Sequence, residues 1–207
     1  MTWIKICGIT NLQDALQAAT LGVDALGFIF APSLRRIDPS GAREIIRSLP
    51  PSVFKIGVFV NEELPEVRRI ADYCGLNKVQ FHGQETPEYC RQVSLPVIKA
   101  VRVKNLESLQ EMAKYPFASI LLDAWSSDQA GSTGKPFGWE MALEARQKRN
   151  FILSGGLNSM NVYRAIEKLR PVGVDVCSGV EQIPRKKDLW KMIDFVKEVR
   201  RADGSTR

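Results

Sequence analysis

The chain has 207 residues and a hydrophobic content of 44%, which is enough for one sizeable core in a single domain. No run approaches the roughly 20 apolar residues of a membrane span, and the N-terminus lacks the apolar run of a secretory signal, so we expect a cytoplasmic protein with no membrane partner. The net charge of +6 suits attraction of anionic substrates. The basic residues form no stripe with aromatic side chains, which argues against a nucleic-acid partner.

Eight short apolar runs alternate with helical patterns. We predict strands at residues 2–7, 24–30, 53–60, 78–81, 96–101, 118–123, 150–153 and 173–176. The intervening segments carry apolar residues at spacings of three and four, as in amphipathic helices. Examples are Leu12, Ala15, Leu16 and Ala19 in the first segment, and Val162, Ala165, Ile166 and Leu169 in the seventh. The sequence thus predicts an α/β protein, a single-domain (β/α)8 TIM barrel over residues 1–201 with a frayed C-terminal tail at 202–207.

The alternative architecture is an open, doubly wound sheet, in which a Gly-rich turn after the first strand binds a nucleotide. In this chain the turn after the first strand is Cys7-Gly8-Ile9-Thr10-Asn11, and the sequence contains neither G-x-G-x-x-G nor a P-loop. The closed barrel is therefore favoured.

The carboxyl ends of barrel strands meet at one pocket, and two of them carry reactive groups. Cys7 ends the first strand, where its thiol is a candidate for chemistry; the alternative is a buried structural cysteine. Asp123 ends the sixth strand over an apolar core, so we expect a general acid that faces Cys7 across the pocket. The alternative for Asp123 is a carboxylate that caps a helix or binds loop backbone.

Small residues follow the last two strands, at Gly155, Gly156, Ser178 and Gly179. Backbone N–H groups in such loops can approach a phosphate, which is a frequent arrangement in TIM barrels. The alternative for the paired glycines is a tight turn between strand and helix. The pattern predicts a small phosphorylated substrate, such as a sugar phosphate.

Three further side chains belong to predicted loops or strand ends. The guanidinium of Arg36 suits a substrate carboxylate. The alternative is that Arg36 is an ordinary solvated arginine on the surface. Gln80 and His82 lie two residues apart on one strand, so both point to the barrel interior, where we expect contact with substrate or with Cys7.

The four cysteines lie far apart and His82 is the only histidine, so neither a disulfide nor a metal site is predicted. Residues 125–137 have the length and polarity of a lid or binding loop.

Seven motifs in order along nearly the whole chain resemble the phosphoribosylanthranilate isomerase family of tryptophan biosynthesis. The motifs are residues 5–10 (KICGIT), 25–30 (ALGFIF), 79–83 (VQFHG), 121–123 (LLD), 131–135 (GSTGK), 153–157 (LSGGL) and 174–181 (VDVCSGVE). The resemblance implies a TIM barrel and an Amadori rearrangement of N-(5-phosphoribosyl)anthranilate to 1-(2-carboxyphenylamino)-1-deoxyribulose 5-phosphate, with no metal or cofactor.

The resemblance also implies roles for individual residues. Asp123 would protonate the furanose ring oxygen, and Cys7, as a thiolate, would remove the C2 proton. Arg36 would hold the anthranilate carboxylate, and Asp175 would steer the ribose hydroxyls or the amine. Gly155, Gly156, Ser178 and Gly179 would bind the phosphate.

One motif departs from the family pattern, because Gly138 stands between Phe137 and Trp139 where an acidic residue is common. An acidic residue at this position would cap the next helix, so its absence affects the start of that helix and the rigidity of the lid rather than the chemistry.

Two rival functions remain. One is a related sugar-phosphate isomerase of the histidine pathway or a dual-substrate enzyme, and the other is a basic barrel that only binds a phosphorylated ligand. Those isomerases are expected to use paired aspartates, so Cys7 argues against them. The sequence leaves the oligomeric state open.

Overall fold

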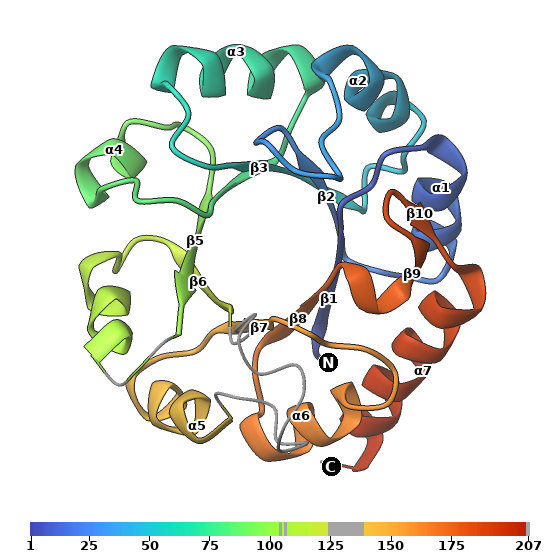
Figure 1. The fold of residues 1–207 in the computed structure, drawn as a ribbon, viewed down its shortest axis with the longest axis vertical. Coiled ribbons are helices and arrows are strands. Elements are labelled where there is room, and N and C mark those ends of the chain that lie inside the picture. The colour runs from blue at the N-terminus through green and yellow to red at the C-terminus, as the bar shows by residue number, and fades with distance from the viewer. Residues whose placement is uncertain (104, 106, 124–138, 206–207) are drawn as a thin grey trace.

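Eight parallel strands close into a barrel in the computed structural model, which describes residues 1–103, 105, 107–123 and 139–205 (Figure 1). The strands are β1 (Trp3–Cys7), β2 (Ala25–Ile29), β3 (Phe54–Phe59), β4 (Lys78–Phe81), β5 (Val97–Arg102), β6 (Ser119–Asp123), β7 (Ile152–Ser154) and β8 (Gly173–Val176). Each strand pairs with its sequence neighbours, and β8 pairs with β1 through Val176 and Ile6. The predicted (β/α)8 barrel is confirmed.

Helices form an outer ring around the strands (Figure 1). They are α1 (Leu12–Thr20), α2 (Pro39–Arg47), α3 (Leu64–Cys74), α4 (Pro87–Arg91), α5 (Trp139–Lys148), α6 (Val162–Leu169) and α7 (Leu189–Ser205), with 3-10 segments η1 (Glu107–Lys114) and η3 (Ser178–Val180). Side-chain caps fix several of their starts. Asn11 accepts a hydrogen bond from the Asp14 N–H, and Asp38 accepts one from the Gly41 N–H, so each satisfies a backbone donor that the first turn leaves free.

The strands separate two apolar layers. Residues such as Ile4 and Ile6 point outward and pack with the helices into the main core. A smaller cluster fills the barrel interior, comprising Ala25, Ile56, Ile98, Ala100, Leu121 and Ile152 with Trp3 packed against it. Because side chains alternate along a strand, Lys5 and Cys7 share the inward face of β1 with Trp3. The alternation therefore places polar groups directly above the interior cluster.

Three details differ from the sequence predictions. On α1 the buried residues are Asp14, Ala15 and Ala18, whereas Leu12 and Leu16 are 42% and 40% exposed, because small alanines let the helix lie close to the barrel. Helix α7 continues to Ser205, beyond the expected start of the tail at residue 202, because Ala202 is buried in the core. A hairpin that the sequence did not predict, β9 (Glu181–Ile183) and β10 (Lys186–Lys187), follows β8.

No helix in the described part of the chain combines the length and the apolar character needed to cross a membrane.

Candidate active site

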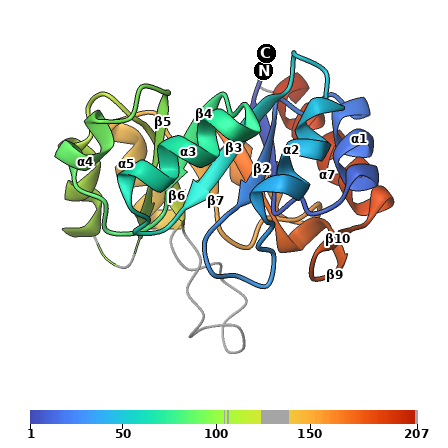
Figure 2. The same ribbon diagram turned by 90° about the horizontal axis from the view of Figure 1, so that it is seen from above.

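The carboxyl ends of the strands open on one side of the barrel, which is the lower side in Figure 2. Cys7 and Asp123 are the last residues of β1 and β6, and His82 directly follows β4. The loop that follows β7 and the turn η3 after β8 lie at this same end, as does the β9–β10 hairpin. Most of the residues predicted for the site are thus brought to one end of the barrel by the fold.

Cys7 occupies a buried position made by a glycine on the neighbouring strand. Its thiol is directed over Gly27, its register partner on β2, where an added Cβ would lie 2.7 Å from the sulfur. Lys5 lies one layer below, and its Cε would be 3.1 Å from the same Cβ. Only 6% of Cys7 is exposed, so the thiol faces the site from a largely water-excluded wall.

Lys5 and Asp175 form a buried ion pair beneath the thiol. The Lys5 Nζ lies 2.9 Å from Asp175 Oδ2, and the lysine side chain is fully buried. Burial acts to lower the pKa of Lys5, but the Asp175 carboxylate and the Cys7 thiol outweigh it and raise the pKa. Burial raises the pKa of Asp175 to about 7, and Lys5 opposes this increase. The Asp175 Oδ1 atom is buried and has no hydrogen-bond partner among the described residues, so one oxygen of this carboxyl group is left unpaired.

Asp123 is held by a chain of side chains from β4. His82 Nε2 lies 3.1 Å from Asp123 Oδ2, and Gln80 Nε2 lies 3.4 Å from His82 Nδ1. When the amide of Gln80 donates to Nδ1, His82 carries its proton on Nε2 and donates it to the carboxylate. His82 therefore contacts Asp123 rather than Cys7, and Gln80, which is 1% exposed, lies behind it.

A second cluster beside Cys7 was not assigned from the sequence. Arg35 donates to both carboxylate oxygens of Glu181, with Nε to Oε1 at 2.8 Å and Nη2 to Oε2 at 2.6 Å. Lys187 contacts Glu181 Oε1 at 3.2 Å and the Cys177 sulfur at 3.8 Å. Cys177 in turn lies beside Cys7, because each directly follows one of the register partners Val176 and Ile6. Lys187 carried no sequence signal, whereas Lys5, beneath Cys7, carried a weak one, since it is a lysine within a predicted apolar strand.

The loops after β7 and β8 touch each other. An added Cβ on Gly179 would fall 1.9 Å from the carbonyl oxygen of Leu157, so only glycine allows this contact. Gly155 and Gly156 have φ values of 100° and 66°, a region that favours glycine. Gly156 and Ser178 are both exposed at this end of the barrel. The arrangement brings backbone from the two predicted phosphate loops to one place.

Arg36 is exposed in the loop after β2, next to Arg35, which is turned inward toward Glu181. Its carbonyl accepts a hydrogen bond of 2.9 Å from Arg185 Nη1, which ties this loop to the β9–β10 hairpin. Gly138 and the loop predicted at residues 125–137 lie outside the described residues. Among the described residues no group of three His, Cys, Asp or Glu side chains could hold a metal ion.

The sequence as a whole matches known proteins that carry the same barrel. Residues 4–198 match the model of the family described as N-(5'-phosphoribosyl)anthranilate (PRA) isomerase. The chain belongs to this family. The enzyme of that name from Pelobacter propionicus is 49% identical over 198 residues, which are 95% of each chain. That from Thermotoga neapolitana is 48% identical over 204 residues, covering 97% of this chain and 99% of the relative.

Solved structures of the isomerase family agree with the fold. The structure of phosphoribosyl anthranilate isomerase from Thermotoga maritima has a TM-score of 0.90 and 46% identity, covering 97% of this chain and 99% of that one. A second structure holds the family enzyme in complex with reduced 1-(o-carboxyphenylamino)-1-deoxyribulose 5-phosphate, with a TM-score of 0.88, 45% identity and the same coverage. As a member of the PRA isomerase family, this chain is an enzyme, an isomerase of tryptophan biosynthesis.

Proposed function

We propose that this isomerase converts N-(5-phosphoribosyl)anthranilate to 1-(2-carboxyphenylamino)-1-deoxyribulose 5-phosphate, with Asp123 as general acid and Cys7 as general base. The observation that carries the proposal is that a thiol and a carboxyl group in different surroundings lie at the same end of the barrel. A buried thiol stands beside lysines, and a carboxyl group bonded to His82 belongs to another strand. An Amadori rearrangement needs an acid and a base of this kind.

The first step is assigned to Asp123. Its proton passes to the furanose ring oxygen, the C1–O bond breaks, and the nitrogen lone pair forms a Schiff base with C1. The hydrogen bond from His82 Nε2, at 3.1 Å, keeps the carboxyl group in one orientation toward the site. A carboxyl group held in one orientation stays within reach of the ring oxygen, which favours proton transfer.

The second step is assigned to Cys7. Its thiolate removes the proton from C2, and the electron pair moves through C1 to the iminium nitrogen, which gives an enolamine. Tautomerisation of the enolamine to the ketone completes the isomerisation. No acyl or phosphoryl group is transferred, so Cys7 acts as a base and forms no covalent intermediate.

The remaining predicted residues hold the substrate. Gly155, Gly156, Ser178 and Gly179 bind the phosphate through the two loops that touch at Leu157. Arg36 pairs with the anthranilate carboxylate, and Asp175 offers its free Oδ1 to the amine or the ribose hydroxyls. The net charge of +6 favours approach of a substrate with these two anionic groups.

The direct test is to incubate the purified protein with freshly prepared phosphoribosylanthranilate and to follow the loss of anthranilate-type fluorescence. We expect rapid loss of fluorescence and formation of the ribulose product, identified by mass spectrometry. Binding of a product analogue without any turnover would contradict the proposal and favour a barrel that only binds phosphorylated ligands. Turnover of a histidine-pathway substrate alone would contradict it as well.

A further inference from the structure

Four side chains near Cys7 take no part in the acid and base steps, yet they form a continuous chain of contacts that ends at Cys177, beside Cys7. Arg35 binds Glu181, Glu181 binds Lys187, and Lys187 contacts Cys177. Cys7 and Cys177 directly follow Ile6 and Val176, which are register partners on β1 and β8, so the two cysteines lie side by side at the strand ends. Cys177 also lies directly over the backbone that follows Cys7, since a Cβ on Gly8 would fall 2.9 Å from its sulfur.

Lys187 is fixed in place although it lies in a short hairpin. Its side chain is fully buried, and its Nζ contacts the Cys177 carbonyl at 3.0 Å and Glu181 Oε1 at 3.2 Å. Its backbone N–H donates to Asp14 Oδ2 at 2.7 Å, which anchors β10 to α1. A buried ammonium held by several partners has little freedom to move, so it defines where the Cys177 sulfur lies.

The charges around Cys7 do not balance without the thiol. The cations are Lys5, Arg35 and Lys187, and the carboxylates are Asp175 and Glu181. With both carboxylates ionised, these five groups carry one net positive charge. Buried charges are stable only when they are paired, so a thiolate at Cys7 completes this cluster.

We propose that Cys177 is a positioning residue for the base: its thiol donates a hydrogen bond to the Cys7 sulfur, and Lys187 holds the Cys177 side chain in the donating orientation. Because the Lys187 ammonium, 3.8 Å away, directs its own hydrogens at the lone pairs of the Cys177 sulfur, the S–H bond is left to point at Cys7. The inference rests on the proposed role of Cys7 as the base.

The electrostatics of the two thiols agree with this geometry. The hydrogen bond from Cys177 lowers the pKa of Cys7, and Lys5 and Lys187 add to the effect against the opposing effect of burial. The same hydrogen bond raises the pKa of Cys177, so the proton stays on Cys177 and the negative charge on Cys7. The charged groups that act on the two thiols are Lys5 from β1, Arg35 from the loop after β2, and Lys187 from β10, with Asp175 on β8 also coupled to Cys7.

The test measures the thiol itself rather than turnover. The rate at which iodoacetamide alkylates Cys7 is followed against pH in the full-length protein, and peptide mass spectrometry separates this adduct from those of the other cysteines. In Cys177→Ala we expect the midpoint of the profile to rise by about one to two pH units, the value of a hydrogen bond to a charged group. Cys177→Ser keeps an O–H donor and should retain most of the depressed midpoint.

Two further variants make the experiment specific. Lys187→Met removes the cation that orients Cys177, so the midpoint should rise in this variant too. Cys74→Ala deletes a buried thiol on α3, whose sulfur contacts the Pro39 carbonyl instead, and should leave the midpoint unchanged. A Cys177→Ala protein with the wild-type midpoint would overturn the inference.

Profiles of kcat/KM against pH separate this inference from the proposed function. If the alkylation midpoint rises in Cys177→Ala but the acid limb of kcat/KM does not move, Cys7 is not the base, while the contact between the thiols stands. If both stay in place while Cys7→Ser is inactive, the base is assigned correctly and Cys177 is an ordinary neighbour.

Discussion

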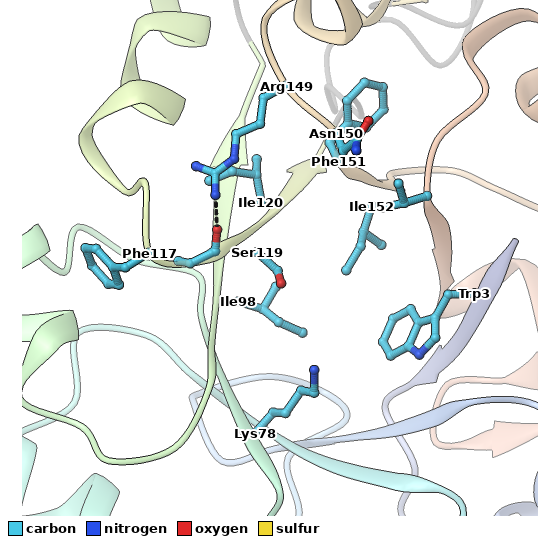
Figure 3. A pocket seen from close by; sticks show the side chains of 12 residues that line it. Trp3, Lys78, Ile98, Phe117, Ser119, Ile120, Arg149, Asn150, Phe151 and Ile152 are labelled. Atoms are coloured by element: carbon cyan, nitrogen blue, oxygen red, sulfur yellow. Dashed lines mark hydrogen bonds between the residues drawn. The ribbon is translucent and has the colours of Figure 1, made fainter.

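The two ends of the barrel are built from the same eight strands but are filled in opposite ways. At the carboxyl end, the thiol of Cys7 lies among buried charges such as the Lys5–Asp175 pair. At the amino end, a cavity of about 550 Å³ lies among apolar and aromatic side chains (Figure 3). It is lined by Trp3, Lys78, Ile98, Phe117, Ala118, Ser119, Ile120, Arg149, Asn150, Phe151, Ile152 and Val172.

The two cations that line the cavity at the amino end make structural contacts. Arg149 donates to the carbonyls of Tyr115, Pro116 and Ala118, the last of which is drawn in Figure 3. Lys78 places its ammonium 4.8 Å from the centre of the Phe54 ring. The difference shows that the charged side chains at the amino end satisfy backbone carbonyls or pack on aromatic rings, whereas those at the carboxyl end surround the reactive thiol. This division between a stabilising end and a catalytic end is general in TIM barrels.

The largest expected effect is that of removing the base from the carboxyl end. Cys7→Ser replaces a thiolate by a hydroxyl that is far harder to ionise, so kcat should fall by about 10²–10⁴ while KM changes little. Steady-state kinetics with phosphoribosylanthranilate measure both constants. Asp123→Asn should be comparably damaging, because an amide cannot supply the ring-opening proton. Near-normal kcat in Cys7→Ser would leave the thiol as part of the core.

The next effect concerns the phosphate loops. Gly156→Asp puts a negative charge where the phosphate is expected, and KM should rise by roughly a hundredfold because like charges a few Å apart repel by a few kcal/mol. Gly156→Asn is the matched control, since asparagine has the same shape and also tolerates the positive φ at this position. Equal KM values for the two variants would remove the phosphate from this loop.

A pair of arginine substitutions compares the two ends directly. Arg36→Met removes the proposed partner of the anthranilate carboxylate, worth roughly 1.5–3 kcal/mol, so affinity for a product analogue should fall at least about tenfold. Arg149→Met removes the donor to four carbonyls, those of Met112, Tyr115, Pro116 and Ala118, so the melting temperature should fall by several degrees while kcat/KM is retained. Calorimetry measures the affinity of both variants for the product analogue, and thermal unfolding measures their melting temperatures. Loss of stability without loss of affinity in Arg36→Met, together with the opposite result in Arg149→Met, would contradict the division into a binding end and a structural end.

The smallest effect is a displacement on the pH axis. Cys7 acts when deprotonated, and the neighbouring Cys177 thiol together with the positive charges of Lys5 and Lys187 lowers its pKa. As the pH falls, kcat/KM should therefore persist well below about 8.5, the usual pKa of a thiol, before the acid limb appears. An acid limb at or above that value in the wild-type protein would show that the cluster does not hold a thiolate.

The sequence predicted the eight strands within about two residues because each is an apolar run bounded by polar residues or glycine. Strand ends in a barrel share one face, so the order of the strands was sufficient to assign Cys7, Asp123 and His82 to one site. The contact between His82 and Asp123 could not be predicted, because alternation gives the face of a side chain but not its partner.

The cluster beside Cys7 escaped prediction for a related reason. Arg35 and Glu181 are separated by 146 positions, and neither carries a local signal for pairing. Residues 185–187 are three consecutive basic residues, yet Lys187 is buried because the unpredicted hairpin turns it inward. A polar hairpin of two short strands lacks the hydrophobic alternation by which longer strands are recognised.

The closure of the barrel between its first and last strands has a consequence for how the chain is made. Thr2 donates to Asp203, β1 pairs with β8, and Lys187 binds Asp14, so the surroundings of Cys7 come from opposite ends of the sequence. A ribosome adds the intervening residues at about 5–20 per second, so the new thiol spends roughly 10 to 40 s outside the protection of the finished site. Throughout that interval Cys7 lacks the lysine and cysteine side chains that later surround it, so its thiol is no more reactive than that of any other cysteine in the nascent chain.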